Sequence, residues 1–241
     1  MKHIPNFITL LNVLSGCIAT VFAVFNQLEF AALFVFLGIF FDFLDGFAAR
    51  ALKAYSELGV QLDSLADMIT SGLVPGVVMF QLLTMAQKEG WNLDLFGVHT
   101  EIGIVPLFGF LITMGAAYRL ANFNVDENQV SSFLGLPTPA NALLILSLPL
   151  ILIHHDYELI NQVILNQWFL IGLTLLSVYL MNSKIELIAL KFNGFGFKEN
   201  GLKYLFIVLS LLLLVFLRFL AIPLIIILYI IVSQFVKIEK K

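Results

Sequence analysis

The 241-residue chain carries little charge, since Asp, Glu, Lys and Arg make up only 12% of it, about half the share found in an average soluble domain. Its 13 basic and 16 acidic residues give a net charge of −3, which excludes a basic nucleic-acid-binding protein. A single cysteine, Cys17, excludes an internal disulfide. No long stretch alternates between apolar and polar residues, which excludes a membrane barrel of strands.

Apolar residues dominate instead, at 60% of the chain and a mean hydropathy of +0.99. A bilayer core of about 30 Å needs roughly 20 apolar residues per helix. We therefore expect an all-α, polytopic integral membrane protein with about eight transmembrane helices. The apolar stretches run over residues 7–25, 30–50, 65–86, 104–121, 139–153, 166–181, 203–217 and 220–236.

The last two stretches form one apolar run of 33 residues, 204–236. A single helix of that length would extend about 50 Å, too long for one crossing. Arg218 lies near the middle of the run and Pro223 follows it. We therefore predict a tight hairpin of two short spans.

The distribution of Lys and Arg predicts the orientation. With eight spans, both termini and the even-numbered loops share one side, which holds eleven basic residues, whereas the other side holds only Lys88 and Arg218. We therefore expect both termini to be cytoplasmic in the cell membrane. The eleven are Lys2, Arg50, Lys53, Arg119, Lys184, Lys191, Lys198, Lys203, Lys237, Lys240 and Lys241.

Four acidic residues lie at or near the cytoplasmic ends of the second and third apolar stretches: Asp42, Asp45, Asp63 and Asp67. Acidic residues are costly in a membrane span and usually functional there. Spacings of three and four put each pair on one helix face. The polar segment 51–58 predicts a short turn, so the two helices are antiparallel neighbours and the pairs face one another.

Four carboxylates in a poorly hydrated space repel one another, so either most are protonated or cations lie among them. Oxygen-only ligands suit Mg²⁺, Mn²⁺ or Ca²⁺ and not zinc. Two such ions stabilise in-line displacement at phosphorus, with Gly46 leaving room for a phosphate and Arg50 binding it. A structural charge network, or a transporter or channel with an aspartate-lined cation path, is the alternative.

The pattern Asp42-x2-Asp45-Gly46-x2-Ala49-Arg50-x8-Gly59-x3-Asp63-x3-Asp67 matches, without a gap, the signature of the CDP-alcohol phosphatidyltransferases. Three further segments resemble the phosphatidylserine synthase branch of that family. They are Pro5-Asn6-x2-Thr9-x2-Asn12, the sequence RLANFN at 119–124 and the sequence FLGLPTPA at 133–140. The branch often has arginine where this chain has Asn122, which removes one cation from the cytoplasmic mouth.

The resemblance implies roles for individual residues. Asp42, Asp45, Asp63 and Asp67 would hold two divalent ions (Mg²⁺ or Mn²⁺, with Ca²⁺ also compatible), and Asp67 would also be the general base. CDP-diacylglycerol would be bound by Asn6, Thr9, Asp45, Gly46, Arg50 and Ser56. We expect a single membrane-embedded domain over residues 1–241, with a family core of about 5–182 and an extra helix pair at about 203–236, and we expect a homodimer.

Within this branch the expected reaction transfers the phosphatidyl group of CDP-diacylglycerol to the hydroxyl of L-serine, giving phosphatidylserine and CMP. Arg119 would bind the serine carboxylate, while Asn122 and Asn124 would add hydrogen bonds. A phosphorylated acceptor would call for more cations, and the segment after the fourth span offers only Arg119 against Asp126 and Glu127. Lys184 and Lys191 weaken this charge argument if they fold over the mouth. Glycerol 3-phosphate or an inositol species is the alternative acceptor.

Overall fold

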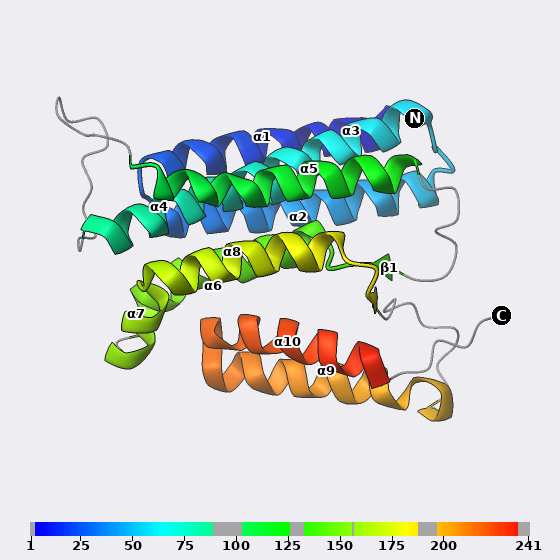
Figure 1. Cartoon of the computed structure of the whole chain (residues 1–241). Coiled ribbons are helices and arrows are strands. Elements are labelled where there is room, and N and C mark those ends of the chain that lie inside the picture. Colours follow the sequence, from blue (N-terminus) through cyan, green and yellow to red (C-terminus); the bar gives the residue numbers. More distant parts are fainter. Residues whose placement is uncertain (1–2, 89–102, 126–132, 156, 188–196, 236–241) are drawn as a thin grey trace.

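The computed structural model describes residues 3–88, 103–125, 133–155, 157–187 and 197–235, and these residues are almost entirely helical (Figure 1). Each of the eight predicted apolar stretches coincides with a helix. The first half contains α1 (Ile4–Val24), α2 (Leu28–Ala51), α3 (Glu57–Asp67), the π-helical segment Met68–Leu73, α4 (Val74–Lys88), the 3₁₀ turn Val105–Gly109 and α5 (Phe110–Val125). The second half contains α6 (Thr138–His154), α7 (Glu158–Ile164), α8 (Gln167–Asn182), α9 (Phe197–Leu217), the 3₁₀ turn Arg218–Leu220 and α10 (Ala221–Phe235).

Several of these helices can cross a bilayer, so the protein is a polytopic membrane protein. By length and hydropathy, four segments of the described chain qualify alone, and α7 with α8, bent by 62°, makes a fifth if the pair is one span. The four are Ile4–Val24, Leu28–Ala51, Glu57–Lys88 and Lys203–Gln234. Eight crossings therefore remain a prediction, because α5, α6 and α8 are shorter than a full span.

The run Lys203–Gln234 passes the hydropathy criterion as one segment, but the chain turns back within it. Arg218 adopts a left-handed backbone conformation, with φ of 48°, and begins the short 3₁₀ turn. Helices α9 and α10 consequently lie side by side (Figure 1). The chain therefore forms the predicted hairpin of two helices, and their crossing of the membrane as two short spans stays a prediction. The α2–α3 connection lies at the same end of the molecule as the first residues of α1 and the last residues of α10 (Figure 1).

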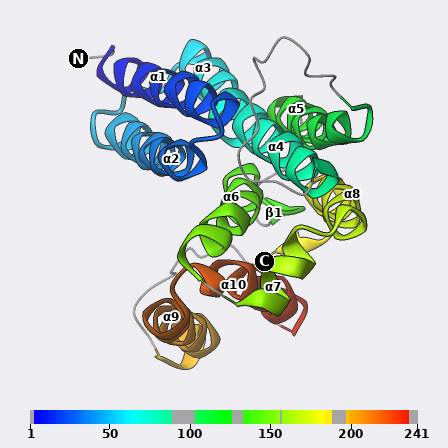
Figure 2. The same cartoon turned by 90° about the vertical axis from the view of Figure 1, so that its left-hand side faces the viewer.

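Helix α4 is the centre of the fold, surrounded in the end-on view by α1, α2, α5, α6 and α8 (Figure 2). Its residues are largely buried, Val78, Met79 and Leu82 completely so. Dense packing around a central helix fixes the position of the helices that continue from it. Helix α3 is joined to α4 through the segment Met68–Leu73, so the packing of α4 also fixes the position of α3.

The π-helical segment Met68–Leu73 joins α3 to α4, and its Thr70 meets α1 and α2. The Thr70 hydroxyl donates to Oδ1 of the buried Asn12, at 2.7 Å. A Cβ on Gly16 or Gly38 would lie 2.5 or 2.6 Å from Thr70 side-chain atoms. These two glycines therefore allow α1 and α2 to approach the segment closely. A π turn is a tertiary effect that apolar periodicity does not predict.

The strands of the described chain are one short antiparallel pair, β1 (Phe133–Leu134) with β2 (Glu186–Leu187). It joins the connection before α6 to the connection after α8. Gly135, with φ of 69°, passes close to the backbone of Met181, where a side chain would not fit. The sequence did not predict this pair, because two-residue strands carry no periodic signal.

Candidate active site

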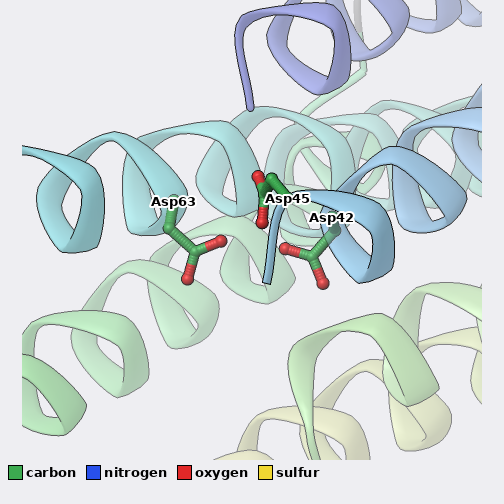
Figure 3. Close-up of side chains that lie close together, drawn as sticks. All are labelled: Asp42, Asp45 and Asp63. Carbon is green, nitrogen blue, oxygen red and sulfur yellow. The ribbon is translucent and has the colours of Figure 1, made fainter. Parts of the chain in front are cut away.

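Three aspartates converge where α2 ends and α3 begins (Figure 3). Asp42 and Asp45 come from α2 and Asp63 from α3, and one carboxylate oxygen from each lies within 4.8 Å of the other two. Asp45 is only 6% exposed. The structure thus brings together three of the four aspartates that the sequence singled out. The two helices were predicted to be direct neighbours, but α2 and α3 instead pack mainly against α1, and only their aspartate side chains converge.

The connection between the two helices is short and well defined. Lys53 has a φ of 49°, which reverses the chain direction directly after α2. Ser56 then caps α3, because its hydroxyl oxygen accepts a hydrogen bond from the Gly59 N–H at 3.0 Å. A Cβ on Gly59 would lie 3.1 Å from this hydroxyl and 3.2 Å from Asn6 Oδ1. Gly59 is therefore required by close packing within the signature.

Asp67 lies one helical turn beyond Asp63 and outside the three-carboxylate cluster. Its charge interacts with those of Asp63 and Asp45 and with the opposite charge of Arg119. Asp42 likewise interacts with Asp67 and Asp63. All four carboxylates therefore form one electrostatic unit, which Asp67 links to Arg119 of α5.

Helix α1 reaches the cluster through Thr9. The Thr9 hydroxyl donates a hydrogen bond of 2.6 Å to Asp45 Oδ2, and both side chains are buried. This bond fixes the orientation of the Asp45 carboxylate. The amino-terminal motif therefore touches the site directly through Thr9, whereas its Asn12 holds the π-helical segment.

A cavity of about 580 Å³ opens beside the aspartates. The space in front of Gly46 is empty to at least 4 Å from where a Cβ would lie. Arg50 borders the same cavity and donates from Nε to the Gly46 carbonyl at 3.0 Å, which leaves its terminal nitrogens available. All the predicted CDP-diacylglycerol ligands line the cavity: Asn6, Thr9, Asp45, Gly46, Arg50 and Ser56.

A second cavity of about 370 Å³ lies next to the first, and Phe123 lines both. Arg119 and Asn122, two of the three predicted acceptor ligands, border it together with Asn182, Ser183 and Lys184. The Nε of Arg119 is buried and has no hydrogen-bond partner among the described residues. An unpaired buried donor beside a polar cavity is available to an anionic group of a ligand.

Asn124, the third predicted acceptor ligand, lies elsewhere. Its side chain accepts a 3.0 Å hydrogen bond from the Ser64 hydroxyl and donates to Gln61 Oε1 at 3.3 Å. It therefore links α5 to α3 and is not among the residues that line the second cavity. The argument that charge favours serine as the acceptor also used Asp126, Glu127 and Lys191. These three lie outside the described residues.

The aspartate cluster fits divalent metal ions. It supplies only carboxylate oxygens, and three of them are close enough to share an ion. Their mutual repulsion in a partly buried site requires compensation, which a dication provides. Asp42, Asp45 and Asp63 could therefore hold a metal such as Mg²⁺ or Mn²⁺.

Comparison with known proteins agrees with this chemistry. Residues 2–182 match the model of the family described as CDP-alcohol phosphatidyltransferase, which is about three quarters of the chain. The chain belongs to this family. It is therefore a membrane-embedded transferase of phospholipid biosynthesis, from an enzyme family that uses divalent metals. The matched region ends with α8, so α9 and α10 lie beyond it.

Three similar proteins are CDP-diacylglycerol–serine O-phosphatidyltransferases. That of Bacillus subtilis is 32% identical over 139 residues, covering 58% of this chain and 71% of its own. That of Methanocaldococcus jannaschii is 28% identical over 176 residues, covering 72% and 71%. That of Helicobacter pylori is 29% identical over 216 residues, covering 89% and 81%.

Sequence reasoning missed part of the second cavity. Asn182 and Ser183 were not singled out, and Lys184 was noted only as a residue able to fold over the mouth. These residues lie at the end of an ordinary apolar helix and belong to no motif that the sequence reveals. The packing of α8 against α5 places them beside Arg119.

Proposed function

We propose that this phosphatidyltransferase transfers the phosphatidyl group of CDP-diacylglycerol to the hydroxyl of L-serine, giving phosphatidylserine and CMP. The observation that carries the proposal is the aspartate cluster that lines the larger of two adjoining cavities. The larger cavity suits a nucleotide, and the smaller one, which Phe123 joins to it, suits a small polar acceptor. The names of the three similar proteins support serine as the acceptor.

The larger cavity would bind the donor. Asn6 and Ser56 border the part of it nearest α3, where the cytidine would lie, and Arg50 would bind a diphosphate oxygen. Asp42, Asp45, Asp63 and Asp67 would hold two divalent ions, which when bound neutralise the diphosphate and the charge that develops on departing CMP. The Thr9 hydrogen bond would keep Asp45 oriented for this role.

The acceptor would enter from the smaller cavity. Arg119 would bind the serine carboxylate, Asn122 would add a hydrogen bond, and Asn124 would hold α5 in register with α3. Asp67 would take the proton from the serine hydroxyl. The serine oxygen then forms a bond to the phosphatidyl phosphorus as the bond from that phosphorus to CMP breaks, and CMP leaves.

Lys184 weakens the argument that the charge of the site favours serine over a phosphorylated acceptor. It borders the acceptor cavity with Arg119, so two cations face the acceptor and a phosphorylated alcohol is no longer disfavoured by charge alone. The choice of serine therefore rests on the similar proteins, and glycerol 3-phosphate is the second candidate. An assay of CMP release distinguishes these candidates. CDP-diacylglycerol and metal are supplied with one acceptor at a time: serine, glycerol 3-phosphate, inositol or inositol phosphate. If serine releases no more CMP than water does, serine is not the acceptor.

Arg119→Ala should raise the KM for serine by about tenfold to a hundredfold, because a charge-assisted hydrogen bond contributes about 1.5–3 kcal/mol. The KM for CDP-diacylglycerol should change little, since Arg119 does not line the larger cavity. Lys53→Ala, which removes a cation from the α2–α3 connection, is the matched control. Equal effects on both substrates would remove Arg119 from the acceptor site.

We further propose that the chain is a single domain in the cell membrane, a homodimer, with the site facing the cytoplasm. In a Cys17→Ala background, Leu58→Cys should react with an impermeant thiol reagent only from the cytoplasmic side. Leu58 is 63% exposed beside the site, and Leu159, 78% exposed at the other end of the molecule, provides the control Leu159→Cys. Labelling of Leu58→Cys in intact cells would reverse the orientation.

A further inference from the structure

A third cavity lies between the α9–α10 hairpin and the helices α2 and α6, and none of the four aspartates lines it. Its volume is about 750 Å³. Eleven of its twelve lining residues are apolar or aromatic, among them Phe36, Leu143, Leu214 and Ile222. The twelfth is Arg218. We call this cavity the hairpin groove.

Arg218 is the charged end of the hairpin groove. It lies at the turn of the hairpin, at the end of the molecule opposite the α2–α3 connection (Figure 1). The residue is exposed and makes no ion pair among the described residues. An exposed basic residue at the membrane surface attracts the anionic headgroups of lipids. The groove therefore joins one exposed cation to a long apolar surface.

The length of the hairpin groove suits a lipid chain. Its lining extends from Arg218 to Tyr229, which is about 16 Å at the rise of a helix and close to half of the roughly 30 Å hydrocarbon core. An acyl chain can lie along a groove of this length, and a phosphate at its head would reach the level of the arginine.

We propose that the hairpin groove binds an anionic phospholipid from the leaflet opposite the active site, with its phosphate at Arg218 and an acyl chain along α10. The apolar lining accepts the chain, and the guanidinium supplies the charge complementarity that a zwitterionic lipid satisfies less well. This site is separate from the donor and acceptor cavities and does not depend on the proposed reaction.

Tryptophan fluorescence quenched by brominated lipids tests the proposal. In a Trp91→Phe, Trp168→Phe background, Leu214→Trp places a reporter in the groove one helical turn before Arg218. In phosphatidylcholine vesicles, brominated phosphatidylglycerol should quench this reporter with an apparent affinity about fivefold above that of brominated phosphatidylcholine, as expected for one cation near the surface. Arg218→Gln should abolish the preference, and Arg218→Lys should retain most of it.

Val215→Trp is the matched control, because Val215 is adjacent, 75% exposed and not part of the groove lining. It should be quenched equally by both lipids. Three outcomes would overturn the proposal. The Leu214→Trp reporter could be quenched equally by both lipids, or its preference could survive Arg218→Gln. It could also show no quenching because a second copy fills the groove. Native mass spectrometry of the unmodified protein provides a second measurement: anionic phospholipid should be retained by the wild type and lost from Arg218→Gln.

Discussion

Replacing Asp42, Asp45 or Asp63 with asparagine is expected to lower turnover by at least about a thousandfold. Each carboxylate belongs to the cluster whose oxygens lie within 4.8 Å of one another, so each substitution would take away one of the oxygens that could hold the metal. Metal ions contribute several kcal/mol to the stabilisation of charge in such transfers, and each 1.36 kcal/mol is a factor of about ten in rate. The affinity for Mn²⁺, measured directly on the purified protein, should fall in parallel.

Stability measurements distinguish this effect from misfolding. Asparagine has nearly the shape of aspartate and removes one of several mutually repelling charges, so the unfolding temperature of the metal-free protein should not fall. Glu57→Gln is the matched control, because Glu57 is an exposed acid in the first turn of α3 that does not line the larger cavity. Near wild-type turnover in any of the three cluster variants would exclude that aspartate as a metal ligand.

Asp67→Asn is expected to lower turnover by about 10²–10⁴-fold while most nucleotide binding is retained. The expected size is that of a general base, which acts at the chemical step and not in binding. Asp67 lies outside the tight cluster and interacts with Arg119 of the acceptor cavity, so its loss should affect the acceptor proton more than the donor. CMP binding and CMP release, measured on the same preparation, separate the two effects.

Asp63→Asn provides the comparison for this prediction, since Asp63 lies on the same helix one turn earlier. If Asp67→Asn weakens nucleotide binding as much as Asp63→Asn does, Asp67 acts as a metal ligand alone and another group is the base. If turnover is near that of the wild type, Asp67 has neither role.

The sequence predicted the helices and the aspartates well because both depend on local patterns. Apolar stretches of membrane length leave the chain few alternatives to helix, and the hairpin followed from a length that exceeds one crossing. The convergence of Asp42 and Asp63 followed from helical spacing and a short turn. In each case residues close in sequence determine the outcome.

The rest of the site depends on residues far apart in sequence. Asn124 looked like an acceptor ligand, yet its amide is engaged by Ser64 and Gln61 of α3. Ser56 was predicted only to bind CDP-diacylglycerol, but its hydroxyl also caps α3. Lys184 comes beside Arg119 only through the packing of α8 against α5. No spacing rule within one segment predicts such contacts.

The π-helical segment Met68–Leu73 determines where the chain length between the aspartates and the core can change. A π turn holds an extra residue compared with an α-helix of similar rise. Deleting one residue there would let α3 and α4 join as a regular helix and leave the direction of Asp63 and Asp67 nearly unchanged, whereas deleting one residue from the α-helical turns on either side would rotate them by about 100° relative to the buried face of α4. For protein engineering, the segment is therefore the place where a one-residue deletion should disturb the aspartates least, at the cost of the close contacts that Thr70 makes with α1 and α2.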